Sequence, residues 1–158
     1  MSVNFKPDAP MGQILEKFWQ GLDEDKGGRA QLRRCKTVNE VVMVPAFHRL
    51  CSRVRPLMKG EHDGWEMRMA AIAGLLAHVR KLEPHKTLAK QMAMGGDTPA
   101  VSELRFRRLL QRNREEFYVA LIRTLGLLDK KANLLDLACS VYYWGDSERK
   151  RWAFAYFS

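Results

Sequence analysis

The apolar residues between positions 65 and 79 recur at the spacing of an α-helix. Five large ones stand at i, i+4, i+7, i+11 and i+14, on one continuous face: Trp65, Met69, Ile72, Leu76 and Val79. The alanines and the glycine between positions 70 and 77 are small enough to let neighbouring helices approach closely. We therefore predict a central core helix over residues 65–82, the longest of the chain, capped by Asp63 and stopped by Pro84.

Shorter segments along the rest of the chain show the same helical spacing. We expect helices over residues 10–22, 29–34, 45–55, 87–94, 102–114, 116–128, 134–144 and 147–157. Two capping-box patterns mark helix starts, one pairing Thr37 with Glu40 and the other pairing Asn113 with Glu116. No segment alternates polar and apolar residues for long enough to indicate a strand. The predicted fold is all-α, with roughly eight to nine helices in two packed bundles.

The segment 94–100 is the expected linker between the bundles, because two glycines and a proline interrupt it. The N-terminal bundle would then cover residues 1–94. The C-terminal bundle would cover residues 95–158 and would carry a strongly basic helix.

Composition is that of a folded protein, with 46% apolar and 28% charged residues in a chain of 158. The longest apolar run, residues 69–77, is about half of the roughly 20 residues needed to cross a bilayer. The first ten residues do not resemble a secretory signal. We expect a cytoplasmic protein that does not bind a membrane.

Residues that often carry catalysis are not grouped in any recognised pattern. None of the four histidines has a second ligand type at metal spacing: His48, His62, His78 and His85. Cys35, Cys51 and Cys139 form no C-x-x-C pair, so neither a disulfide framework nor a zinc site is indicated. The paired glycines lack the lysine and strand of a phosphate-binding loop. We predict no enzymatic activity, no metal and no cofactor.

Positive charge is concentrated in the expected helix 102–114. The whole chain has a formal net charge of +9, from 27 Lys and Arg against 18 Asp and Glu. On a helical projection Phe106, Leu109 and Leu110 fall within an arc of about 100°. Three arginines fall within an arc of roughly 60° beside it: Arg105, Arg108 and Arg112. Because guanidinium is planar and always charged, this row suits the phosphates of a nucleic-acid backbone, although a solvated basic face would show the same pattern.

An aromatic cluster occupies the last part of the chain, from Tyr142 to Phe157, and basic residues interrupt it. Aromatic side chains beside arginines can stack on bases. However, this half of the chain has few other large side chains with which to close a core. We therefore predict that Trp152 and Tyr156 are core residues, and that Arg149, Lys150 and Arg151 contact nucleic acid.

Several segments together resemble one known family. They are Ala30-Gln-Leu-Arg-Arg34, Val44-Pro-Ala-Phe-His-Arg-Leu50, Leu104-Arg-Phe-Arg-Arg-Leu-Leu110 and Tyr143-Trp-Gly145 followed by Glu148-Arg149 and Trp152. In order and spacing this set is similar to the small subunit of the type I-E CRISPR Cascade effector complex, the CasB family. The basic positions of that family that match here are Arg34, Arg105, Arg123 and Arg149.

The resemblance implies an all-helical, non-enzymatic subunit that is present in two copies in an RNA-guided DNA-binding complex. Its implied partners are single-stranded DNA of the R-loop, the guide RNA, the other Cascade subunits and a second copy of itself. The implied role is to hold strands by their backbones, in antiviral defence, while guide pairing reads the sequence.

Two other classes of function remain open from the residues alone. A helix-turn-helix regulator would also be small, helical and basic, but the connection over residues 126–133 is longer than its tight turn and the helix that follows is apolar. A scaffold that binds acidic protein surfaces is the other alternative. Salt-dependent binding to random single-stranded DNA would separate the scaffold from the nucleic-acid subunit.

Overall fold

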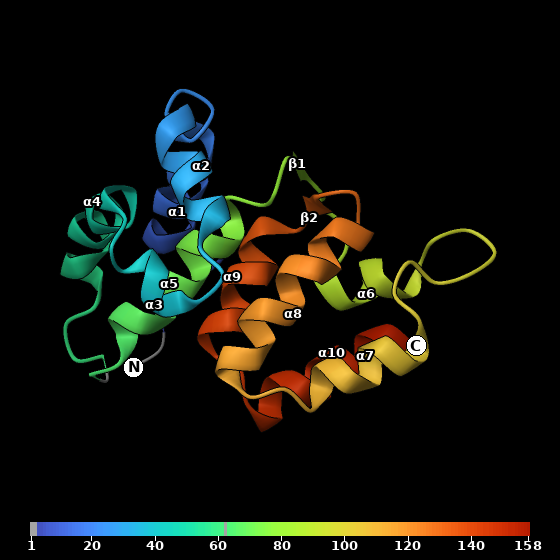
Figure 1. Cartoon of the computed structure of the whole chain (residues 1–158). Helices are drawn as coiled ribbons and strands as arrows, with labels where there is room; N and C mark the ends of the chain where they lie inside the picture. Colours follow the sequence, from blue (N-terminus) through green and yellow to red (C-terminus); the bar gives the residue numbers. More distant parts are fainter. Residues whose placement is uncertain (1–2, 62) are drawn as a thin grey trace. The chain divides into compact units, whose positions relative to one another are not determined.

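The all-α prediction is confirmed by a computed structural model, which describes residues 3–61 and 63–158 (Figure 1). His62 lies outside the described residues. The described part contains ten α-helices, one short 3-10 helix and two strands of two residues each. The chain forms two compact units, Met1–Ala77 and His78–Ser158, called here the N-terminal and C-terminal units.

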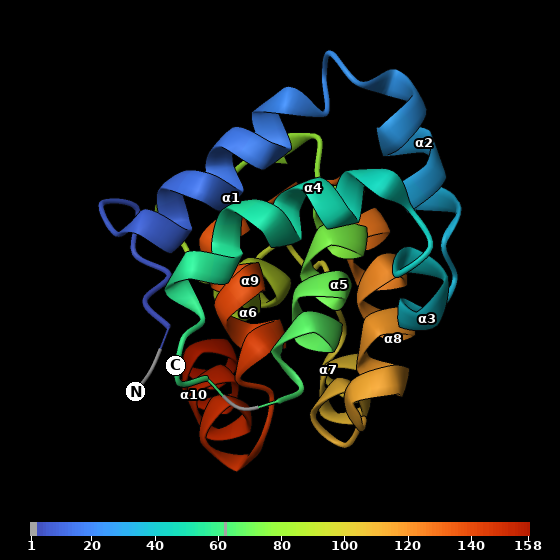
Figure 2. The ribbon, with the colours of Figure 1, turned by 90° about the vertical axis from the view of Figure 1, so that its left-hand side faces the viewer.

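Helix α5 (Trp65–Leu76) is the centre of the N-terminal unit. The other elements of this unit are α1 (Pro10–Gly21), α2 (Lys26–Arg34), α3 (Val38–Val41), α4 (Pro45–Val54) and η1 (Arg55–Leu57). Helices α2, α3 and α4 pack on α5, and α1 runs alongside α4 (Figure 2). Nine of the twelve residues of α5 are buried, as the broad apolar face predicts.

The predicted start of this central helix at Trp65 is confirmed, but its predicted cap and its predicted end are wrong. Helix α5 begins after Gly64 without a side-chain cap, so Asp63 does not cap it. It ends at Leu76, because the following segment pairs with a distant one. Strand β1 (Lys81–Leu82) lies parallel to β2 (Lys131–Ala132), and the backbone N–H of Arg80 donates to the carbonyl of Lys130 at 2.7 Å. The longest described helix is instead α8 (Arg114–Leu127).

Aromatic side chains form the core of the C-terminal unit. Besides β1, β2 and α8, this unit contains α6 (Leu88–Ala93), α7 (Glu103–Leu110), α9 (Leu134–Tyr142) and α10 (Asp146–Phe157). Trp152 and Tyr156 are buried, which confirms the sequence prediction for both. The ring of Tyr156 stacks on Phe106 at a centroid distance of 4.0 Å, and Phe117 stacks on Trp144 at 3.7 Å.

The boundary between the units differs from the linker expected near residue 95. Strand β1 pairs with β2 and helix α6 packs on α10, so residues 78–94 belong to the C-terminal unit. The glycine-rich segment is a turn inside that unit. The N–H of Ala100 donates to the carbonyl of Met94 at 3.0 Å, and Gly96 has a φ of +84°, which favours glycine.

No helix among the described residues is both long and apolar enough to cross a bilayer. Within the same residues, no group of three or more His, Cys, Asp or Glu side chains is placed to hold a metal ion.

Candidate nucleic-acid interface

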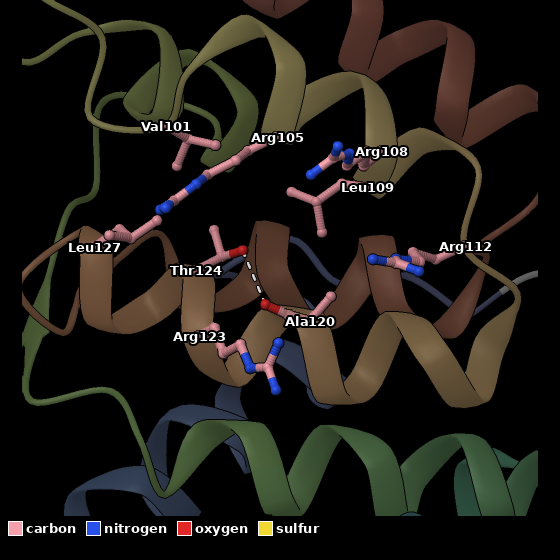
Figure 3. Close-up of a pocket in the computed structure, with 9 residues that line it drawn as sticks. All are labelled: Val101, Arg105, Arg108, Leu109, Arg112, Ala120, Arg123, Thr124 and Leu127. Atoms are coloured by element: carbon pink, nitrogen blue, oxygen red, sulfur yellow. Dashed lines mark hydrogen bonds between the residues drawn. The ribbon is translucent and has the colours of Figure 1, made fainter.

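Four arginines line one groove between α7 and α8 in the C-terminal unit (Figure 3). Arg105, Arg108 and Arg112 come from the α7 side, and Arg123 comes from α8. The groove has a volume of about 280 Å³. Its remaining lining residues are small or apolar: Val101, Leu109, Ala120, Thr124 and Leu127. We call this site the arginine groove.

The amphipathic pattern of α7 turns its arginines toward solvent. Ser102 caps the helix, since its Oγ accepts from the backbone N–H of Arg105 at 3.3 Å. Phe106 and Leu109 are buried, and Phe106 packs on the rings of α10. Burial of these two residues fixes the rotation of α7 about its axis, so that Arg105 and Arg108 are exposed at the groove.

Arg112 reaches the groove from a turn and not, as predicted, from the helix that carries the other two. Helix α7 ends at Leu110, and α8 begins at Arg114 with Asn113 as its cap. The capping box predicted for Asn113 and Glu116 is confirmed. The Oδ1 of Asn113 accepts from the N–H of Glu116 at 2.9 Å, and the N–H of Asn113 donates to Oε1 of Glu116 at 3.2 Å. This box ends the first helix, because the chain must become extended before the second begins.

The charge of the arginine groove has no internal counter-charge. No carboxylate is among its lining residues. Within the part of the chain that the structure describes, none of the ion pairs involves Arg105, Arg108, Arg112 or Arg123. Glu116 lies close by and borders an adjoining cavity of about 400 Å³, together with Arg108 and Arg112. Four cations on one concave surface repel one another, so the groove favours an anionic ligand.

Family comparison agrees with the resemblance carried by the sequence. The family model of CRISPR-associated protein Cse2 matches residues 28–157, which is most of the chain. The chain belongs to the Cse2 family. No curated protein sequence matches it significantly.

Two solved structures share the fold of this Cse2-family chain. One is a chain of the E. coli Cascade complex bound to a PAM-containing double-stranded DNA target. It has 25% sequence identity and a TM-score of 0.70, and the match covers 92% of this chain and 93% of the other. The second is CasB from Thermus thermophilus, with 21% identity, a TM-score of 0.62, and coverage of 90% and 96%.

Arg149 was predicted to contact nucleic acid, but its guanidinium holds the turn between α7 and α8. Its Nε donates to the carbonyl of Leu110 at 2.7 Å and its Nη2 donates to the carbonyl of Arg112 at 3.1 Å. It also lies over the ring of Trp144, with its Cζ 5.2 Å from the centroid, and pairs with Asp146 at 3.3 Å. Helix α10 begins after Gly145 without a side-chain cap, and Asp146 in its first turn contacts Arg149.

Arg151 is likewise engaged inside the Cse2-family fold. Its guanidinium donates to Glu148 at 2.7 and 2.9 Å, to Asp136 at 2.8 Å and to Ser140 at 3.0 Å. The hydrogen bonds with Glu148, helped by the charges of Asp136 and Glu148, raise its pKa above the ordinary arginine value. Two carboxylates compensate its charge, so Arg151 contributes little positive potential at the surface.

The remaining predicted contacts, Lys150 and Arg34, lie outside the arginine groove. Lys150 is exposed on α10 and borders a separate cavity of about 350 Å³ with Phe154 and Phe157. Arg34 is exposed at the end of α2 in the N-terminal unit. The structure thus brings together four of the eight predicted residues in one groove: Arg105, Arg108, Arg112 and Arg123.

Arg114 is a structural residue that sequence reasoning missed. Its guanidinium donates to the carbonyls of Val141, Tyr142 and Trp144 at 2.9–3.1 Å, where α9 ends. No signal near Arg114 in the sequence marks this role, because its partners are about thirty positions away. Val101 and Leu127 in the groove lining were also missed, since Val101 precedes α7 and Leu127 is the last residue of α8.

The cysteines are free thiols that behave as small apolar residues. Cys35 and Cys51 are buried, and Cys139 is partly buried. Burial raises the pKa of Cys51 and of Cys139 to about 11. Both thiols therefore stay protonated at neutral pH and are poor nucleophiles.

We expect Arg149→Met to lower the free energy of unfolding by about 2 kcal/mol, because two carbonyls at the turn lose a charged donor. Lys150→Met is the control, since the neighbouring lysine is exposed and borders a different cavity. Denaturant unfolding followed by circular dichroism would compare the two variants. Equal stability of both would show that Arg149 does not hold the turn.

Proposed function

We propose that this Cse2-family chain is a non-catalytic small subunit of a type I-E Cascade complex, and that its arginine groove holds the backbone of a single strand in the open R-loop. The observation that carries the proposal is the convergence of four uncompensated arginines on one groove. Its partners would be single-stranded DNA, guide RNA, other Cascade subunits and a second copy of the chain. The similar E. coli chain comes from a Cascade complex bound to a DNA target, which supports the same kind of assembly here.

The groove suits a phosphate backbone better than it suits base edges. Reading base edges in a duplex requires positioned hydrogen-bonding side chains such as Asn or Gln, and the lining residues include neither. Guanidinium groups neutralise phosphates and release counterions, whatever the sequence. In an RNA-guided complex such binding is sufficient, because pairing with the guide supplies the specificity.

Holding a displaced strand would favour the open R-loop. The heteroduplex is about as stable as the DNA duplex that it replaces, so a modest binding energy for a separated strand shifts the balance. The groove has no catalytic pair. Its one hydroxyl, that of Thr124, donates to the carbonyl of Ala120 at 2.9 Å and has no base beside it.

The helix that follows the connection over residues 126–133 is not exposed, as the recognition helix of a helix-turn-helix regulator would have to be. Helix α9, which follows the connection over residues 126–133, buries seven of its nine residues. A recognition helix must instead present its polar side chains to the major groove.

The test is reconstitution of Cascade from a guide RNA, the other subunits and one form of this chain. Three forms of the chain are compared: the unmodified chain, a groove variant and a control variant. The groove variant carries Arg105→Gln, Arg108→Gln and Arg112→Gln. The control variant carries Arg33→Gln, Arg53→Gln and Arg107→Gln, three exposed arginines outside the groove, and so removes the same charge. Permanganate oxidation of unpaired thymines measures how much of the target is open.

We expect the groove variant to assemble normally but to open less of the target than the control variant, because a separated strand would be held less firmly. A groove variant that assembles and opens as much target as the unmodified subunit would contradict the proposal.

A further inference from the structure

The arginine groove has an apolar floor that a phosphate backbone alone would not use. Val101 and Leu109 are 1% and 4% exposed and form its closed part, while Leu127 is 40% exposed at its edge. Thr124 adds no free hydrogen-bonding group, because its hydroxyl is bonded to the carbonyl of Ala120 (Figure 3). The groove therefore combines a cationic rim with an apolar floor whose one side-chain hydroxyl is already bonded.

A ligand for this surface needs an anionic part and a flat apolar part close together. We propose that the groove takes one nucleotide of a single strand, with its phosphates on the arginines and its base against Leu109 and Leu127. This inference rests on the proposed function, which requires only contact with the backbone. It adds that the groove binds a base as well.

The cost of turning a base out of a duplex explains why the nucleotide would come from a single strand. In a duplex the bases are stacked and paired, and turning one out costs a few kcal/mol. The bases of a separated strand are already free. Arginine side chains at the rim can also stack on a base through the planes of their guanidinium groups. The site would therefore favour separated strands over duplex without reading sequence.

Leu127 and Val119 provide a matched pair of variants for the floor. Both are apolar, both lie on α8 and both are 40% exposed, but only Leu127 lines the groove. Leu127→Ser should weaken binding of a short oligothymidine to the full chain about fivefold, because apolar contact with the base is lost. Val119→Ser should leave binding unchanged. Melting curves of both variants check that they fold.

A second measurement needs no variant. An oligomer of the same length in which every base is replaced by an abasic spacer keeps all its phosphates. We expect the full chain to bind it about tenfold more weakly than oligothymidine, with the same dependence on salt. Parallel titrations with oligouridine and abasic RNA extend the test to RNA. A loss of affinity on removing the bases, in DNA or in RNA, supports the base site. The nucleic acid that binds more tightly then shows whether the site takes a DNA or an RNA strand.

The two proposals fail in different ways. If removing the bases costs no affinity in DNA or RNA while the groove variant binds both more weakly, the groove holds backbone only. The base site is then wrong and the proposed function stands. If the groove variant binds oligothymidine and oligouridine as well as the unmodified chain does, both proposals are overturned.

Discussion

Trp152→Ala is expected to lower the free energy of unfolding by about 3–5 kcal/mol, the cost of truncating a large aromatic residue in a core. Trp152 is fully buried, and its ring lies 5.1 Å from the ring of Trp144 and 5.5 Å from that of Phe117. Its indole Nε1 donates to the Oγ of Ser140 at 2.9 Å. The substitution would leave a cavity and remove one of the two donors to the buried hydroxyl of Ser140, the other being Arg151.

Phe154→Ala is the control on the same helix. Phe154 is 79% exposed, so its truncation should change the free energy of unfolding by less than about 0.5 kcal/mol. Chemical denaturation measures both variants. If Trp152→Ala left stability unchanged but abolished nucleic-acid binding, Trp152 would be a platform for stacking bases and its assignment to the core would be wrong.

The groove variant is expected to lose about two units of salt dependence in its binding to single-stranded DNA. Each phosphate neutralised on a single strand contributes roughly 0.7 to the slope of log K against log salt concentration. Arg105, Arg108 and Arg112 would account for three such contacts. Glutamine keeps helix propensity and polarity while it removes the charge, so the variant should remain folded.

Titration of oligothymidine at several salt concentrations measures this slope for the groove and control variants. Adding Arg123→Gln to the groove variant should reduce the slope further, because Arg123 lines the same groove. Arg114 would be a misleading control, since its guanidinium holds three carbonyls at the end of α9. Equal losses in the groove and control variants would show that general positive charge, and not the groove, attracts the strand.

The sequence by itself determined most of the helices and the residues that face the core. Helix starts depend on side chains within one turn, so the capping boxes at Thr37 and Asn113 could be predicted and are confirmed. The helical period likewise identified Phe106 and Leu109 as buried and Arg105 and Arg108 as exposed. In both cases the pattern that carries the prediction lies within a few residues along the chain.

Only the tertiary structure decided where α5 ends and which arginines are available to a ligand. Helix α5 stops where its continuation pairs with β2, about fifty residues further on. Arg112 and Arg123 come from different segments and meet at one groove. Arg149, close in sequence to the exposed Lys150, instead binds carbonyls nearly forty residues away. A guanidinium stands at the end of a long flexible side chain, so its partner depends on which segments the fold brings within reach.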